Sequence, residues 1–268
     1  MPIVTFTTDF GFRDGYAGAM KGVVLSLAPA ATLVDITHGV PPQDVAAGAV
    51  ALSQAAALYP PGTVHVAVVD PGVGSARADL LVESGGSFFV GPDNGVLSLA
   101  ARRPRRIRRI EAVAFRREPV SPTFHGRDVF APTAGLLAAG ARPEDAGPAI
   151  ESMIDLAVEP VSRRAGVVEG RVIHVDGFGN LITSLDAHSL PAPGAGEQVA
   201  QLSVEIEGQG GLFHPVFGRT FSDVDPGALV AYIGSGGQLE IARRDGSAAA
   251  RVGGERGTIV RARAAEGG

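Results

Sequence analysis

The chain has 268 residues, 45% of them hydrophobic and 19% charged, so it can bury the core of one large domain or two smaller ones. No apolar run approaches the roughly 20 residues of a membrane helix. The N-terminus lacks the regions of a signal peptide, so we expect a cytoplasmic protein. The absence of cysteine excludes disulfides and cysteine metal sites, and the net charge of -5 argues against a general nucleic-acid binder.

Strand and helix patterns alternate in the first third of the chain. Strands are predicted at Ile3–Thr8, Thr32–Ile36 and Val66–Val69, and helices at Tyr16–Ala28 and from Pro41 to about Leu58. A β-α-β-α-β order gives parallel strands with right-handed crossovers, whose carboxyl ends share one edge. Asp9 and Asp70 each follow a strand, so we expect them to face the same crevice.

The later segments are shorter. Two strand-like segments are predicted within Leu80–Val90, a further strand over Ile107–Ala112 and a helix over Val129–Ala139. Residues 141–164 are rich in proline and charge with little periodicity. From Gly166 onward the chain has short alternating segments separated by glycine, which are typical of a barrel or sandwich. These segments are Val167–Val175, Asn180–Leu185, Val199–Ile206, Leu229–Ile233, Leu239–Ala242 and Thr258–Ala262. We therefore expect an α/β domain with a largely parallel sheet at 1–140, a linker at 141–165 and an all-β barrel domain at 166–268.

The segment VAVVDPGVGSAR places Asp70 at the end of a buried strand, followed by a stiff Pro-Gly turn. Arg77 is near enough for its guanidinium to fold back toward the Asp70 carboxylate. Strand ends of this kind often carry chemistry in α/β sheets. A structural turn closed by a salt bridge is the alternative interpretation.

Pro119–Phe130 leads into a helix and brings His125 close to a helix N-terminus. Together with Asp9, Asp70 and Arg77, His125 could orient and activate a water molecule, because an imidazole exchanges protons near neutral pH and an arginine favours anions. The alternative is a buried ion pair beside a core histidine.

Two glycine-rich turns in the second half could bind a ligand. In DGFGN, Phe178 lies between glycines and could pack on a flat ligand, while Asp176 and Asn180 suit ammonium groups and purine edges. Around Ser235, glycines let backbone amides approach a carboxylate. Ordinary hairpin turns would have the same composition.

Two further functional hypotheses, a metal site and a phosphate-binding patch, have less support from the residues. A metal could be bound by a set of acidic and histidine side chains, but no HExxH motif or paired histidines accompany them. This set is Asp9, Asp35, His38, Asp70 and His125. The basic run Arg102–Arg109 could hold phosphates, but it contains no aromatic residue to stack on bases.

Seven motifs in fixed order carry a resemblance to a known family. They are TDFG at Thr8–Gly11, VDITH at Val34–His38, VVDPGVGS at Val68–Ser75, GPDNG at Gly91–Gly95, SPTFHGRD at Ser121–Asp128, DGFGN at Asp176–Asn180 and SGGQLEIA at Ser235–Ala242. Over nearly its whole length, the sequence resembles the S-adenosyl-L-methionine hydroxide adenosyltransferase family, relatives of the fluorinase and chlorinase enzymes.

The resemblance implies an S-adenosyl-L-methionine hydrolase, in which water or hydroxide attacks the ribose C5′ and releases adenosine and L-methionine. It also implies an α/β domain followed by a β-barrel, and a homotrimer with each site between the N-terminal domain of one subunit and the barrel of the next. We expect no metal, no cofactor besides the substrate S-adenosyl-L-methionine, no nucleic acid and no membrane partner.

The resemblance also implies roles for individual residues. The residues that match the family's water-activating trio are Asp70, Arg77 and His125. Asp9 would hold the ribose hydroxyls, and Phe178 and Asn180 would contact the adenine. Asp176 would hold the methionine amino group, and Ser235 its carboxylate.

Some positions depart from the halogenases. Val73 and Gly126 stand where those enzymes place hydroxyl side chains around the halide, and Asp70 stands where the fluorinase has an aromatic residue. These differences favour oxygen as the nucleophile. Gly236 replaces an arginine of the fluorinase's methionine-binding turn, which leaves carboxylate recognition open. The alternatives are a chlorinase-like halogenase and a non-catalytic protein that binds adenosine or S-adenosyl-L-methionine.

Overall fold

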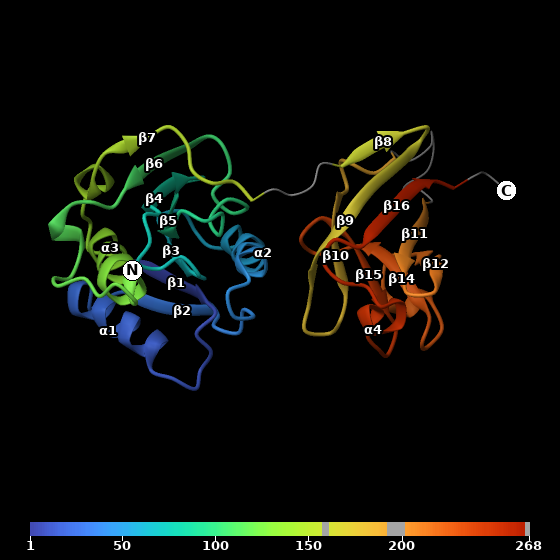
Figure 1. Ribbon diagram of the computed structural model, residues 1–268, viewed down its shortest axis with the longest axis horizontal. Coiled ribbons are helices and arrows are strands. Elements are labelled where there is room, and N and C mark those ends of the chain that lie inside the picture. The colour runs from blue at the N-terminus through green and yellow to red at the C-terminus, as the bar shows by residue number, and fades with distance from the viewer. Residues whose placement is uncertain (157–160, 192–201, 266–268) are drawn as a thin grey trace. The chain divides into compact units, whose positions relative to one another are not determined.

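A computed structural model describes residues 1–156, 161–191 and 202–265 of the protein. The chain divides into two units, Met1–Leu156 and Ala157–Gly268 (Figure 1). Among the described residues, no helix has both the length and the apolar character needed to cross a bilayer.

The first unit contains a seven-stranded sheet in the order β2-β1-β3-β5-β4-β6-β7. Its strands are β1 (Ile3–Thr8), β2 (Thr32–Thr37), β3 (Val64–Val68), β4 (Asp79–Ser84), β5 (Ser87–Pro92), β6 (Arg105–Arg109) and β7 (Ala149–Ile150). The pairs β1–β2, β1–β3 and β3–β5 are parallel. The pairs β4–β5, β4–β6 and β6–β7 are antiparallel.

The α/β character of this unit is confirmed, but the sheet is mixed rather than largely parallel. The change of direction begins at Gly85 and Gly86, whose φ values of +59° and +81° form a two-residue turn between β4 and β5. Both residues need positive φ, a conformation that glycine adopts without steric cost. Such a short connection can only join antiparallel strands.

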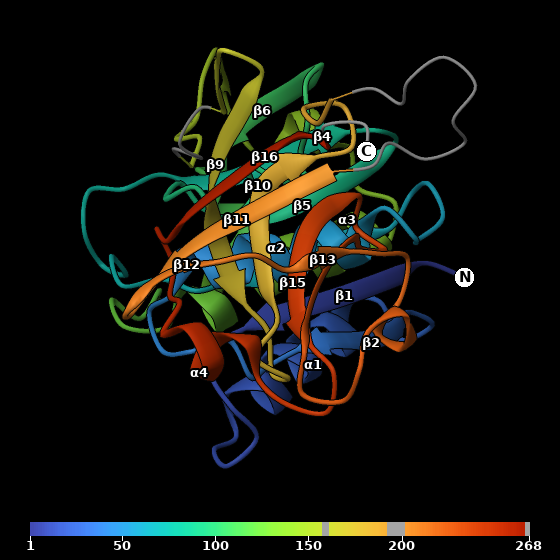
Figure 2. The ribbon, with the colours of Figure 1, turned by 90° about the vertical axis from the view of Figure 1, so that its right-hand side faces the viewer.

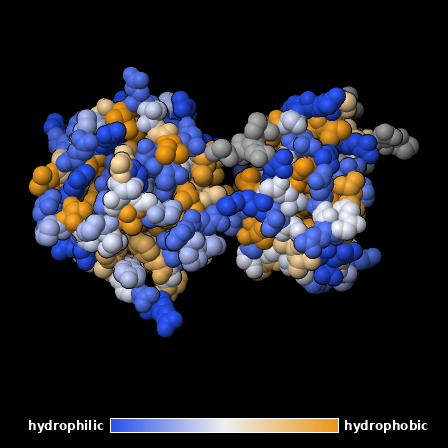
Figure 3. Space-filling model, viewed as in Figure 1, coloured by the Kyte–Doolittle hydropathy of each residue, from blue (hydrophilic) through white to orange (hydrophobic). Residues whose placement is uncertain are grey.

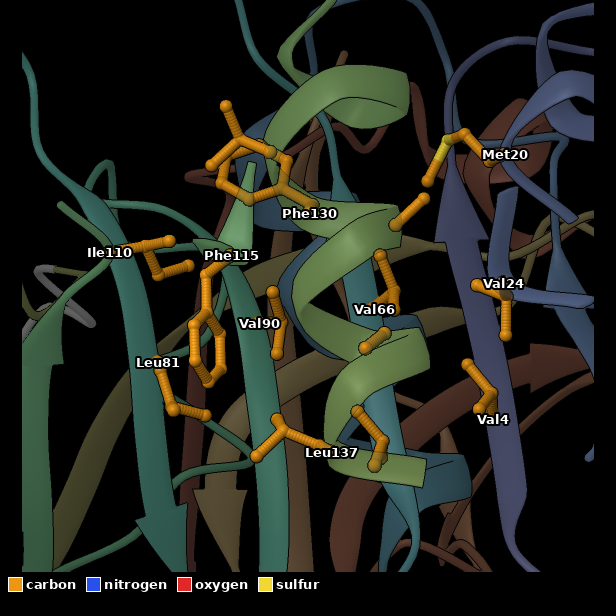
Figure 4. Packing of buried hydrophobic residues seen from close by; sticks show 14 of the residues in the cluster. Val4, Met20, Val24, Val66, Leu81, Val90, Ile110, Phe115, Phe130 and Leu137 are labelled. Atoms are coloured by element: carbon orange, nitrogen blue, oxygen red, sulfur yellow. The ribbon is translucent and has the colours of Figure 1, made fainter. Parts of the chain in front are cut away.

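Three helices cover the two faces of this sheet: α1 (Tyr16–Leu27), α2 (Val45–Ala56) and α3 (Ala131–Ala138). On one face, Val24 of α1 and Leu137 of α3 pack in the same core as Val66 of β3 (Figure 4). The other face packs Leu52 of α2 in a core with Ala67. Successive side chains of a strand point to opposite faces, so β3 is buried on both sides, and its residues are apolar except for His65.

The second unit contains a curled sheet (Figure 2). Its strand order is β12-β11-β16-β9-β10-β15-β14-β13, and β8 pairs with β9. Its strands are β8 (Ser162–Arg164), β9 (Val167–Val175), β10 (Leu181–Asp186), β11 (Leu202–Gly208), β12 (Gly211–Phe213), β13 (Val216–Phe217), β14 (Leu229–Ile233), β15 (Gln238–Arg243) and β16 (Ile259–Ala264). A short helix, α4 (Ala248–Val252), follows β15.

One core fills the curl of the second sheet, with contributions from Leu185, Ile206, Ile241 and Val260. Within the described strands, the two ends of the pairing order, β12 and β13, are not hydrogen-bonded to each other. The expected barrel is thus observed as an open, curled sheet. Of the segment predicted at Val199–Ile206, residues 199–201 lie outside the described residues.

The stretch expected to be a linker contributes to both sheets. Pro143–Ala146 forms a 3₁₀ turn, and Ala149–Ile150 adds an edge strand to β6 in the first unit. Ser162–Arg164 pairs with β9 in the second unit. On the faces visible in Figure 3, hydrophobic residues are scattered among hydrophilic ones in each unit, as is usual for protein surfaces.

Candidate active site

A cavity of about 650 Å³ lies in the first unit, next to the carboxyl ends of β1 and β3. Asp9 follows β1, Asp70 follows β3, and both line this cavity. The two strands are parallel neighbours, so their ends meet at one edge of the sheet. The topology therefore brings together two carboxylates that lie far apart in the sequence.

One wall of the cavity is aromatic. The rings of Phe10, Tyr16 and Phe124 contact each other with centroid distances of 5.3 to 6.0 Å, mostly edge to face. All three residues line the cavity. Phe10 and Phe124 lie inside the TDFG and SPTFHGRD motifs, whereas Tyr16 opens α1, so no single sequence motif marks this wall. An aromatic wall excludes water and offers a surface for an apolar or flat part of a ligand.

Asp70 and Arg77 form a two-point ion pair beneath the cavity. Arg77 Nε donates to Asp70 Oδ1 at 2.9 Å, and Nη2 donates to Oδ2 at 2.5 Å. The two side chains are only 5% and 8% exposed. The pairing predicted from the turn is therefore present, and its planar fork fixes the orientation of both groups.

Gly74 allows this turn to lie against the segment that carries His125. Its φ is +78°, and a Cβ at this position would lie 2.3 Å from the carbonyl oxygen of Pro122. A residue with a side chain would therefore be strained by its backbone and would also collide with Pro122. The close approach brings the Asp70 turn and the His125 segment to the same side of the cavity.

Arg77 stays cationic in this environment. Burial acts to lower its pKa, but hydrogen bonds to Asp70 and Asp79 outweigh burial and raise the pKa above its ordinary value. The guanidinium also lies over the ring of Phe130, 5.6 Å from the centroid. The cavity is therefore backed by a fixed positive charge with carboxylates on two sides.

His125 joins this cluster at the start of a π-helical turn, Gly126–Phe130. Its Nδ1 lies 3.1 Å from Arg77 Nη2 and 3.1 Å from Asp79 Oδ1. Asp79 also contacts Arg77 Nη1. Asp79 was not predicted as a site residue because it opens an apolar strand; the available signal was its position two residues after Arg77. Asp70, Arg77 and His125 are thus brought together, with Asp79 as an unexpected fourth member.

Asp9 is held by neighbouring loops. Its Oδ2 accepts a hydrogen bond of 2.8 Å from the Gln43 backbone. The preceding Thr8 contacts Nδ1 of the fully buried His38 at 2.7 Å, and His38 Nε2 lies 3.0 Å from Asp35. Because Thr8 Oγ1 also accepts from the Phe10 backbone, its hydroxyl hydrogen is free to point at Nδ1. His38 and Asp35 thus position the loop that carries Asp9.

The alternative metal site requires several of these side chains to converge. Within the part of the chain that the structure describes, no three His, Cys, Asp or Glu residues lie together as a metal would need. Asp35 is instead paired with Lys21 at 2.6 Å and with His38.

In the second unit, Asp176 organises the turn between β9 and β10. Its Oδ1 accepts from the backbones of Phe178 at 2.9 Å and Asn180 at 2.8 Å, and Asn180 Nδ2 donates to its Oδ2 at 2.9 Å. Asn180 is buried, whereas Phe178 is 84% exposed. The turn therefore presents one aromatic ring to its surroundings, as the flanking glycines predict.

Ser235 lies in the exposed turn between β14 and β15. Tyr232 and Glu240 face each other on these strands, and the Tyr232 hydroxyl donates to Glu240 at 3.1 Å. Burial raises the pKa of Glu240, and the nearby charge of Asp176 raises it further against the opposing hydrogen bond from Tyr232. This buried pair is not evident in the sequence, because a glutamate inside a strand is typical of an outward-facing position.

Comparison with known proteins places the chain among relatives of similar length. It is 41% identical over 257 residues to a protein of Salinispora tropica named (R)-S-adenosyl-L-methionine hydrolase, covering 94% of each chain. A protein of the same name from Thermus thermophilus is 43% identical over 267 residues, covering 96% of this chain and 98% of that one. The crystal structure of an uncharacterized conserved protein from Thermotoga maritima is 31% identical, with a TM-score of 0.84 and coverage of 98% and 99%.

Family models match both halves of the sequence. The SAM hydroxide adenosyltransferase N-terminal domain matches residues 4–147, and the C-terminal domain of the same family matches residues 170–261. These ranges contain the Asp70 cluster and both glycine-rich turns. The chain therefore belongs to the SAM hydroxide adenosyltransferase family.

Proposed function

We propose that the protein hydrolyses S-adenosyl-L-methionine to adenosine and L-methionine, and that it acts on the form with R configuration at sulfur. The observation that carries the proposal is the buried Asp70–Arg77 pair with His125 beside a cavity that also contains Asp9. The names of the relatives from Salinispora tropica and Thermus thermophilus supply the substrate and its configuration.

In the proposed step, a water oxygen forms a bond to C5′ while the C5′–S bond breaks. The bonding electron pair goes to sulfur, so the sulfonium becomes the neutral thioether of methionine, and one water proton goes to a base. His125 is the proposed base, and Arg77, held by Asp70, stabilises the negative charge that develops on the oxygen. The positive charge is lost from sulfur and reappears on the imidazole of His125, so the step creates no additional net charge in the cleft.

The remaining site residues have proposed roles in binding. Asp9 would accept hydrogen bonds from the ribose hydroxyls. In the second unit, the exposed Phe178 would stack on adenine and Asn180 would hydrogen-bond its edge. Asp176 would pair with the methionine ammonium, and Ser235 would donate to its carboxylate.

The reaction type is tested by incubating the protein with each sulfonium diastereomer in ¹⁸O-water. The proposal predicts label in the 5′-hydroxyl of adenosine, faster turnover of the R form and an unchanged rate in the presence of a chelator. Chloride and fluoride are added in parallel. Formation of 5′-halo-5′-deoxyadenosine would identify a halogenase, and binding without release of methionine would identify a non-catalytic binding protein.

A homotrimer with sites shared between subunits is also proposed, from the family resemblance. Co-expression of Asp70→Asn with Asp176→Asn tests it, since a shared site can combine the two unaltered halves in one mixed trimer. Partial activity of the mixture, with each variant inactive alone, would support sharing. A monomeric mass in solution would contradict the trimer.

A further inference from the structure

Asp79 is a buried carboxylate that the proposed chemistry leaves without a role. It is the first residue of β4, and its side chain is 9% exposed. Its Oδ1 contacts Arg77 Nη1 and lies 3.1 Å from His125 Nδ1, while Oδ2 lies 3.7 Å from Arg116. His125 and Asp70 line the cavity, whereas Asp79 and Arg77 lie behind them, so an effect of Asp79 on the reaction would pass through His125.

Arg77 and Asp79 compete for the same nitrogen of His125. Arg77 Nη2 can only donate, so it requires a lone pair on Nδ1, whereas Asp79 can only accept and requires a hydrogen there. In neutral imidazole, Nδ1 can satisfy one of them but not both. The choice also sets the protonation of the other ring nitrogen. With the proton on Nδ1, Nε2 has a free lone pair; with Nδ1 unprotonated, Nε2 carries the proton.

We propose that Asp79 is a positioning residue that keeps the neutral His125 proton on Nδ1. This inference rests on the proposed function, in which His125 accepts a proton from water. Because Nδ1 faces Arg77 and Asp79, the opposite ring edge with Nε2 is the one that His125 can turn to the cavity it lines. Only the tautomer held by Asp79 gives that nitrogen the lone pair that a base needs.

The same tautomer changes one contact of Arg77. The guanidinium has five N–H groups. The Nε hydrogen and one Nη2 hydrogen are donated to the Asp70 carboxylate. The two hydrogens of Nη1 are donated to Asp79 and to the carbonyl oxygen of Ala78, the latter at 3.2 Å. When His125 donates to Asp79, Nδ1 no longer accepts the second Nη2 hydrogen of Arg77, which still points at the imidazole. Asp79 thus frees the lone pair that deprotonates the water, on the ring edge opposite to Arg77.

Asp79 also balances the charge that the step creates. When the water proton reaches Nε2, the imidazolium lies 3.1 Å from the cationic Arg77, which opposes its formation. The Asp79 carboxylate accepts from Nδ1 in this state and offsets the repulsion. Arg116 is the other cation that faces Asp79, at 3.7 Å, and its side chain is 26% exposed, so solvent screens it more than Arg77.

The tautomer can be measured without substrate. Protein labelled with ¹⁵N-histidine gives separate ring signals for protonated and bare nitrogens, and His125→Gln assigns the His125 pair. We expect the neutral ring to carry its proton on Nδ1 in the wild type and on Nε2 in Asp79→Asn. Asp145→Asn, which alters an exposed ion pair with Arg142, serves as the matched control and should leave the spectrum unchanged.

Kinetics then test the consequence. Asp79→Asn should lower kcat by about 100-fold or more with little change in KM, and should move the acid limb of the pH profile to lower pH by about one unit or more. A wild-type ring protonated on Nε2 overturns the proposal, as does an unchanged tautomer and pH profile in the variant. If Asp79→Asn does not fold, the wild-type spectrum alone still tests the proposal, because it shows which ring nitrogen of His125 carries the proton. Absence of hydrolysis would reject the proposed function alone, because the spectrum needs no substrate.

Discussion

His65 makes the stability of the first unit sensitive to acid. It lies on β3 and is fully buried, with its ring stacked on Phe89 at a centroid distance of 5.0 Å. Nδ1 contacts Thr5 Oγ1 at 2.8 Å on the neighbouring strand. In the described part of the chain, Nε2 has no hydrogen-bond partner. Burial therefore disfavours the charged ring and lowers the pKa of His65 to about 4.

The size of the effect follows from the two pKa values. In the unfolded chain the imidazole has a pKa near 6.5, so below that pH the unfolded state binds a proton that the folded state does not bind until the pH approaches about 4. Stability is therefore lost as the pH falls from about 6.5 to about 4. The loss from this one group is about 2 kcal/mol between pH 7 and pH 5, and about 3 kcal/mol when complete.

The perturbation is His65→Asn, which removes the titration but keeps a polar atom near the position of Nδ1. Urea unfolding, followed by circular dichroism at pH 7 and pH 5 and at one protein concentration, gives the free energy of unfolding of each protein. The variant should be less stable at pH 7, because its side chain fills the space less well. Its loss between pH 7 and pH 5 should be about 2 kcal/mol smaller than that of the wild type.

The comparison isolates His65, because other groups titrate alike in both proteins. Asp35 and Asp128, for example, have lowered pKa values and reduce stability only at lower pH. Equal losses in the two proteins would refute the reasoning, because they would mean that the ring gains a proton in the folded state as easily as in the unfolded one.

Three further predictions concern the site. Arg77→Met should cost about 3 to 5 kcal/mol of unfolding free energy, because it leaves the buried Asp70 carboxylate without its cation and Asp79 with only the more distant Arg116. Arg77→Lys keeps the charge but not the two-point contact, so it should lose hydrolysis with a smaller loss of stability in urea unfolding. Equal losses of stability in the two variants would contradict this. Gly74→Ala should destabilise the protein by about 1 to 3 kcal/mol more than Gly62→Ala. Both positions have positive φ, but only a Cβ at position 74 would collide with Pro122. Equal thermal unfolding of the two variants would show that the close approach of Gly74 to Pro122 carries no cost. Phe178→Ala should change the unfolding free energy by less than about 0.5 kcal/mol, because the ring is 84% exposed. The same variant should raise KM about tenfold, because the stacking of the ring on adenine is lost. An unchanged KM would show that Phe178 does not contact adenine.

Part of the candidate site could be predicted because its causes are local or topological. The Asp70–Arg77 pair lies within one stiff turn, so its two partners could not move far apart. The shared cavity of Asp9 and Asp70 follows from the rule that parallel strands end at one edge. The exposed ring of Phe178 follows from a turn whose glycines cannot cover it.

Other members of the site depend on contacts that no local pattern encodes. Asp79 begins a strand that reads as apolar, and its role depends on where that strand lies in the sheet, beside β5 and β6. The contact between Gly74 and Pro122 joins segments separated by many residues, as does the pairing of His125 with Arg77. Such contacts are set by strand order and loop packing.

By itself, the sequence determined the α/β character of the first unit, the strand ends that carry carboxylates and the motifs of the family, because side-chain periodicity and turn stereochemistry act over a few residues. Only the tertiary structure decided that the first sheet is mixed, that the second sheet is curled and open, and that Asp79 reaches His125. These features arise from hydrogen bonds and packing between distant segments, whose partners a one-dimensional pattern does not specify.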